Sequence, residues 1–86
     1  MIKIYYTTMG EIIGEEDPTK ERTLKFALLL QQSKEKGLQL GKYTRIKDGT
    51  LTFEKTSIVA SGEVEKELAD VYLEQKAKIY SNLILP

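Results

Sequence analysis

The sequence contains no cysteine, no histidine and no tryptophan, and only two prolines. Without thiols or imidazoles the chain has neither disulfides nor thiolate nucleophiles, and it lacks the usual zinc ligands and the commonest acid–base catalyst. Positive charge is not in excess either, because 13 Lys and Arg residues balance 13 Asp and Glu residues. We therefore do not expect a protein that binds nucleic acid through bulk charge.

Long apolar runs are also missing, since no stretch approaches the roughly 18 residues that a membrane span requires. The opening MIKIYYTT alternates from Ile2 and lacks an apolar block of signal-peptide length. We expect no membrane association and a cytoplasmic protein, located in the host cytoplasm if the protein is viral. A chain of 86 residues is expected to form one domain, residues 1–86, small enough for oligomerisation to help bury its apolar surface.

Short alternating segments typical of β-strands occupy most of the chain up to residue 61. Gly14 and Gly41 predict bends within two of these strands, and Asp48-Gly49 is typical of a type I′ hairpin turn. The polar, proline-containing stretch 15–22 predicts a solvated loop or a frayed strand end. Together these features predict a mainly β fold, a small and strongly bent five-stranded antiparallel sheet or barrel.

The stretch TLKFALLLQQ, residues 23–32, predicts a strand that is apolar on both faces. Strict alternation places Leu24, Phe26, Leu28 and Leu30 on one face and Ala27 and Leu29 on the other. A strand of this kind needs cover on both sides. We expect the interior of a barrel to cover one face and a helix or a neighbouring subunit to cover the other.

A change of period after residue 63 predicts a C-terminal helix over about residues 64–76. Apolar residues recur there with helical spacing, at Val64, Leu68, Val71 and Tyr72. This stripe is expected to cover the barrel rather than form a partner groove. The apolar segment 79–86 that follows is expected to dock as an extended tail on the same subunit or its neighbour.

These segments resemble a known family in their order and local motifs. The frame MGEIIGEE, then LQLGKY, then FEKTSIVASGEVEKELADVYLEQ with an aliphatic tail ending in proline is similar to the small Sm-like proteins of cyanophages and related marine viruses. The resemblance implies an Sm-like barrel with a C-terminal helix. It also implies that edge strands pair between subunits and close a homo-oligomeric ring, for which we favour a pentamer among plausible sizes of about five to seven.

The resemblance further implies single-stranded RNA binding or an RNA chaperone role. Cellular Sm-like proteins bind RNA through two loop signatures, whereas the corresponding regions here read EEDPTKER and FEKTS and contain neither. The alternative is therefore a structural or adaptor ring that binds a protein partner and no nucleic acid. The two functions remain open at this stage.

Several residues are candidates for these interactions. The RNA-binding candidates form the only basic cluster that includes an aromatic residue, which could stack on a base; they are Lys42, Tyr43, Arg45 and Lys47. A solvated strand-to-turn segment is the simpler interpretation of the same cluster. The subunit-interface candidates are Leu29, Ile58 and Val59. We expect no enzymatic activity, catalytic residue, metal site or cofactor, because no carboxylate spacing indicates a reactive pair or an oxygen-ligand cage.

Overall fold

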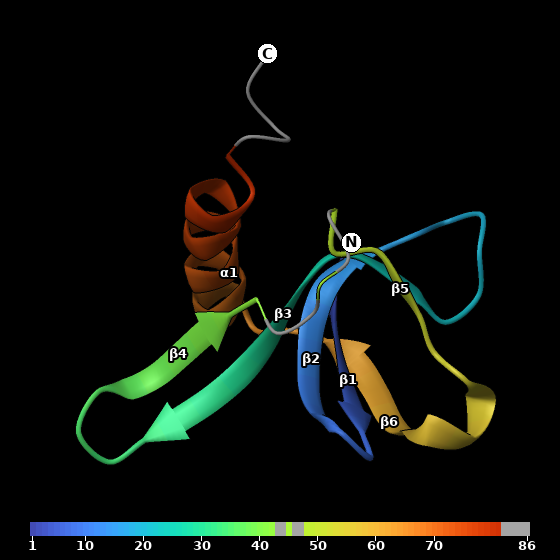
Figure 1. Cartoon of the computed structure of the whole chain (residues 1–86), viewed down its shortest axis with the longest axis horizontal. Helices are drawn as coiled ribbons and strands as arrows, with labels where there is room; N and C mark the ends of the chain where they lie inside the picture. The colour runs from blue at the N-terminus through green and yellow to red at the C-terminus, as the bar shows by residue number, and fades with distance from the viewer. Residues whose placement is uncertain (43–44, 46–47, 82–86) are drawn as a thin grey trace.

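The computed structural model describes residues 1–42, 45 and 48–81. Seven β-strand and helix elements and one short 3₁₀ helix follow one another along the chain (Figure 1). They are β1 (Ile2–Thr7), β2 (Gly10–Glu16), β3 (Thr23–Ser33), β4 (Gly37–Gly41), β5 (Leu51–Thr52), the 3₁₀ helix η1 (Lys55–Ser57), β6 (Ile58–Glu63) and α1 (Lys66–Ile79).

The strands form one six-stranded sheet in the order β4-β3-β2-β1-β6, with β5 beside β3 but off this path. All the strand pairs are antiparallel. The predictions of an antiparallel, mainly β fold and of a C-terminal helix are thus confirmed. The sheet has six strands rather than five because β4 pairs with the second half of β3 and the short β5 pairs with its first half. In the described part of the chain the sheet is open, with β4 and β6 at its two ends.

A β-bulge divides β3 into two halves. Lys25 pairs with Glu15 and Leu28 pairs with Ile13, so two residues of β3, Phe26 and Ala27, lie opposite the single Gly14 of β2. A side chain at position 14 would collide with β3, because its Cβ would lie 2.9 Å from the Lys25 carbonyl oxygen. The bend that Gly14 predicted is therefore present, and glycine permits the close approach of the two strands.

The bulge changes which residues share a face of β3. Leu24 packs with Ala27 and Leu29 in one apolar cluster, while Leu28 packs with Phe26 and Leu30 in another. The assignment of Leu24 to the same face as Leu28 was therefore wrong, because strict alternation holds only as long as no extra residue is inserted. The expectation that both faces are apolar and covered holds for the described chain.

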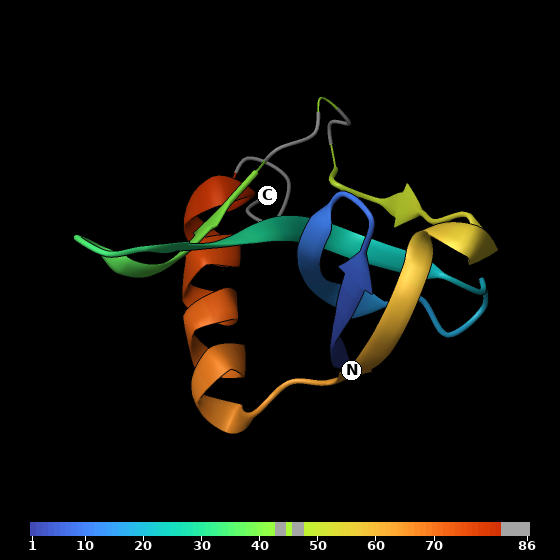
Figure 2. The same ribbon diagram turned by 90° about the horizontal axis from the view of Figure 1, so that it is seen from below.

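Each face of β3 is covered by other parts of the same chain. Helix α1 packs over one face through the buried Tyr72, with Leu68 at the margin, and the buried Tyr80 directly after the helix packs on the same face. The other face lies against Tyr5 of β1 and Phe53 near β5, whose rings meet edge to face at 5.3 Å. Figure 2 shows α1 at one end of the sheet and β5 and β6 at the other. A neighbouring subunit is thus not needed to cover this strand.

Helix α1 is displaced by a few residues from the predicted range, beginning at Lys66 and ending at Ile79. Glu67 lies in its first turn and Lys76 and Lys78 in its last turn, which favours the helix dipole. The apolar segment predicted to dock as a tail lies mostly outside the described residues, since the structure describes it only as far as residue 81.

The predicted hairpin at Asp48-Gly49 falls partly outside the described residues, which omit residues 46–47 before the turn. The following strand, β5, pairs with β3, while the Gly49 carbonyl accepts a hydrogen bond from the amide of Ala27 at 2.9 Å. Gly49 has a φ of +68°, and a side chain there would collide with the Tyr80 hydroxyl. The Asp48-Gly49 segment therefore packs against the bulge of β3.

Candidate functional site

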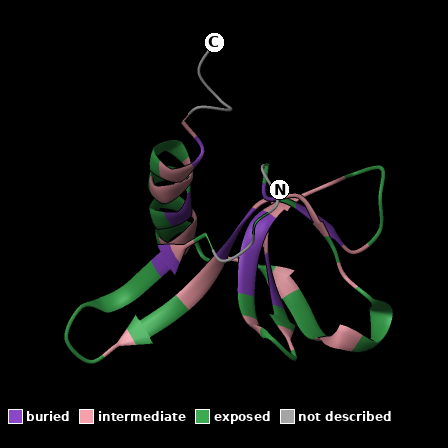
Figure 3. Cartoon of the chain, viewed as in Figure 1, coloured by how far each residue is buried: buried purple, intermediate pink, exposed green. Residues whose placement is uncertain are grey.

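The two terminal strands of the sheet are the least buried parts of the β structure. Figure 3 shows exposed residues along most of β4 and much of β6. Both strands carry an exposed aliphatic side chain: Leu38 on β4 is 46% exposed and Val59 on β6 is 77% exposed. An apolar sheet edge without a partner strand is a site at which a second chain can pair.

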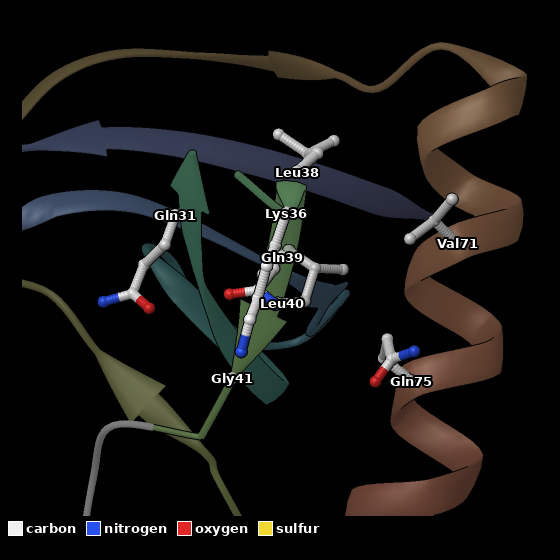
Figure 4. Close-up of a pocket in the computed structure, with 8 residues that line it drawn as sticks. All are labelled: Gln31, Lys36, Leu38, Gln39, Leu40, Gly41, Val71 and Gln75. Atoms are coloured by element: carbon white, nitrogen blue, oxygen red, sulfur yellow. The ribbon is translucent and has the colours of Figure 1, made fainter. Parts of the chain in front are cut away.

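Beside the β4 edge lies a pocket of about 400 Å³ between this strand and helix α1. In Figure 4, Val71 and Gln75 project from the helix toward β4, and Leu40 points from β4 toward the helix. A second, more apolar hollow continues past Leu38 and Val71 toward Leu68 at the start of the helix, where Glu65 and Glu67 also line it. We call these two adjoining hollows the β4/α1 groove.

The lining of the β4/α1 groove combines aliphatic side chains with amides and a few charged groups. Its polar side chains near β4 are mainly the amides of Gln31, Gln39 and Gln75, together with the ammonium group of Lys36. Neutral amides and aliphatic side chains beside a free backbone edge suit an extended polypeptide, whose own backbone can pair with β4.

The three interface candidates occupy different positions. Val59 is on the surface at the β6 edge, whereas Leu29 and Ile58 are half-buried and pack against the core cluster around Tyr5 and Ile12. Val59 is therefore the candidate that is directly available to another chain.

The basic cluster is described only in part, because Tyr43 and Lys47 lie outside the described residues. Lys42 and Arg45 are both exposed. The Lys42 ammonium group lies 5.2 Å from the centre of the Tyr80 ring, within the range of a cation–π contact. Lys42 thus contacts the C-terminal end of α1 rather than standing alone in solvent.

The acidic residues at positions 15–17 each have partners within the chain. Glu15 pairs with Lys76 of α1, and Glu16 pairs with Lys3 at 2.8 Å. The side-chain hydroxyl and then the backbone amide of Thr19 donate to Asp17, and these hydrogen bonds lower the pKa of its carboxyl group. Among residues 1–42, 45 and 48–81, no three His, Cys, Asp or Glu side chains form a group that could hold a metal ion.

Two buried tyrosines each donate a hydrogen bond to a backbone carbonyl of β3, which the sequence did not indicate. The Tyr72 hydroxyl donates to the carbonyl of Phe26 at 2.8 Å, and the Tyr80 hydroxyl donates to the carbonyl of Ala27 at 2.7 Å. The sequence placed Tyr72 in the apolar stripe of the helix. Tyr80 lies two helical turns further along, and this spacing is the one sequence signal that both tyrosines lie on the same side. Their acceptors depend on the bulge of β3 and were not predictable.

Comparisons with known proteins do not place this chain in a family. Neither a family model nor a curated protein matches it. Within the part of the chain that the structure describes, no helix is long and apolar enough to span a membrane.

Proposed function

We propose that the protein is a non-enzymatic assembly module of the Sm-like type, in which the β4 edge of one copy pairs with the β6 edge of the next. The observation that carries this proposal is the open sheet whose two terminal strands present Leu38 and Val59 to solvent. Because the two edges differ, their contact is heterologous, and a rotation that closes produces a ring. Five copies are the size we favour, within a range of about five to seven.

Pairing between copies would also remove a liability of the single chain. Open edges with apolar side chains promote uncontrolled aggregation unless they are paired, covered or charged. Pairing β4 with β6 satisfies the free backbone groups of both edges in one contact, and it buries Val59, which is 77% exposed in the single chain. A closed ring pairs both of these edges in every copy, since each copy uses its β4 and its β6.

A charge placed on the β6 edge tests this assembly. We expect Val59→Lys to reduce the solution mass measured by light scattering to that of a single chain, because a lysine on an edge strand opposes pairing. The matched control is Leu73→Lys, which introduces the same charge at an aliphatic side chain of α1 that is 47% exposed, and it should leave the mass unchanged. Leu38→Lys provides an independent test from the β4 side. An assembly that survives both edge variants contradicts the proposal.

We further propose that the ring acts as an adaptor that binds a protein segment. The β4/α1 groove supports this function because the aliphatic side chains and amides beside β4 suit a polypeptide backbone, while Glu65 and Glu67 at the helix end of the groove disfavour phosphates. The balanced charge of the chain also gives no general attraction for phosphates. RNA binding is the second candidate, favoured by the exposure of Lys42 and Arg45 in one segment and by the Sm-like resemblance.

The dependence of RNA affinity on salt separates these two functions. For an adaptor we expect a labelled single-stranded RNA to bind weakly or not at all at low salt. An RNA-binding ring would instead lose affinity steeply with salt, with a slope of about −0.7 in log K against log salt for each phosphate contacted. A steep slope that disappears in Lys42→Ala/Arg45→Ala, but not in the equally charged control Lys34→Ala/Lys55→Ala, would establish RNA binding and overturn the adaptor.

A further inference from the structure

The bulge of β3 is a strained segment that the sheet alone does not hold. Phe26 has a φ of 51°, in the left-handed region that non-glycine residues rarely adopt. Neither Phe26 nor Ala27 has a register partner on β2. On the other side of β3, pairing with β5 ends at Leu24 and pairing with β4 begins at Leu29. The backbone of the bulge therefore needs hydrogen-bond partners from outside the sheet.

Helix α1 and the residue after it supply hydrogen-bond donors for the carbonyls of Phe26 and Ala27. Tyr72 and Tyr80 are 0% and 2% exposed, and their hydroxyls donate to the carbonyls of Phe26 and Ala27 across 46 and 53 residues of sequence. The Tyr72 hydroxyl also lies 3.4 Å from the carbonyl of Lys25. We call Tyr72 and Tyr80 the tyrosine latch. Without it, two acceptors in the interior would lose their donors, which is more costly than the loss of a solvent-exposed hydrogen bond.

Other contacts from α1 meet at the same point. The Phe26 ring packs edge to face on the Tyr80 ring at 5.3 Å, and the Lys76 ammonium group lies 4.4 Å from the centre of the Phe26 ring. Lys76 also pairs with Glu15, the residue that follows Gly14 on β2. The helix thus contacts both strands of the bulge.

We propose that the tyrosine latch, by holding α1 against the bulge, sets the register of the second half of β3. It thereby also sets the position of β4, the strand that forms one assembly edge. The bulge inserts one residue, so its loss would shift the pairing by one position and move side chains such as Leu28 to the opposite face. Since β4 pairs only with the residues of β3 beyond the bulge, β4 moves with them. A ligand or partner that displaces α1 would consequently reposition the edge. The part of this inference that concerns assembly rests on the proposed function, whereas the coupling of α1 to β3 does not.

Removal of the two hydroxyls tests the latch while keeping the aromatic packing. In the double variant Tyr72→Phe/Tyr80→Phe we expect amide hydrogen exchange to become about tenfold or more faster in segments 25–30 and 37–41, because two buried acceptors lose their donors. Exchange in β1 and β6 should change by less than about twofold, since local opening leaves the rest of the sheet paired. The control Tyr6→Phe removes a hydroxyl from a tyrosine that is 43% exposed and should change neither region.

The pattern of exchange decides between a latch and general stabilisation. Faster exchange confined to β3 and β4 supports the latch, whereas an equal increase in all strands, or no increase, overturns it. The single variants Tyr72→Phe and Tyr80→Phe are measured in the same way if the double variant does not fold. Light scattering on the same samples separates the two proposals: an unmodified protein of single-chain mass refutes the ring, and the exchange pattern still decides the latch.

Discussion

At the scale of single residues, Tyr80 links the end of the helix to the bulge of β3. Its hydroxyl donates to a buried carbonyl while Gly49 packs directly against the same hydroxyl. Burial raises the pKa of this hydroxyl from 10.0 to about 12, with a smaller contribution from the nearby Asp48. Burial also raises the pKa of Tyr72. Both phenols are therefore held in the protonated form that can donate.

This pKa shift predicts a loss of stability at alkaline pH. The pKa of Tyr80 is higher in the folded state than in the unfolded state. The protonated hydroxyl therefore contributes fully to the free energy of unfolding below pH 10, and this contribution is lost as the pH rises toward 12. We expect the free energy of unfolding, measured in urea, to fall more steeply above about pH 10 in the unmodified protein than in Tyr80→Phe, by on the order of 1–2 kcal/mol. Identical pH profiles for the two proteins would contradict this role of the hydroxyl.

The sequence contained some of these residue-level features but not others. Gly14 and the helical stripe that includes Tyr72 were identified because a glycine in a strand and a 3.6-residue period are local signals. The hydrogen bonds of Tyr72 and Tyr80 join residues that are 46 and 53 positions apart, and no local pattern encodes such a pairing. For the same reason, the contact of Lys42 with the Tyr80 ring was not predicted.

At the scale of elements, the fit of β2 against β3 depends on glycine at position 14. A Cβ there would lie 2.9 Å from the Lys25 carbonyl oxygen and 3.0 Å from the Leu24 Cβ, neither of which can move without the backbone. We expect Gly14→Ala to lower the free energy of unfolding by roughly 1–3 kcal/mol, which is typical of overpacking, as measured by urea denaturation.

The matched control for this variant is Gly62→Ala in β6, where a Cβ meets nothing within 4 Å. Because the site is open, this control should be neutral or slightly stabilising, by up to about 1 kcal/mol, through the reduced entropy of the unfolded chain. Equal effects of the two substitutions would show that the close approach at Gly14 is not important for stability.

Most strands and the helix were predictable from the sequence, whereas the pairing of the strands and the faces of their side chains were less predictable. The alternation in residues 2–7 and the helical period after residue 63 are properties of single segments, and both gave the correct element type. The strand has the expected bounds, whereas the helix is displaced by two to three residues. The face assignment in β3 failed because one inserted residue reverses the alternation. The pairing of β5 with β3 was not indicated by the sequence, because the choice of partner for so short a strand depends on packing.

At the scale of the whole molecule, the chain covers both faces of its central strand, and among residues 1–42, 45 and 48–81 no strand pairs with the outer edge of β4 or of β6. The need for cover on β3, which first indicated a partner, is met within one chain by α1 and by the strands at the other end of the sheet. The case for self-association therefore depends on the edges β4 and β6. Of the predicted interface residues, Val59 is the one on the surface of such an edge.

The absolute mass of the unmodified protein in solution tests the proposed assembly most directly. Size-exclusion chromatography with light scattering, repeated over a dilution series, distinguishes a closed ring from weak association because a closed ring persists on dilution. We expect a single species of about five to seven copies at every concentration. A species with the mass of one chain throughout the series would contradict the pairing of β4 with β6.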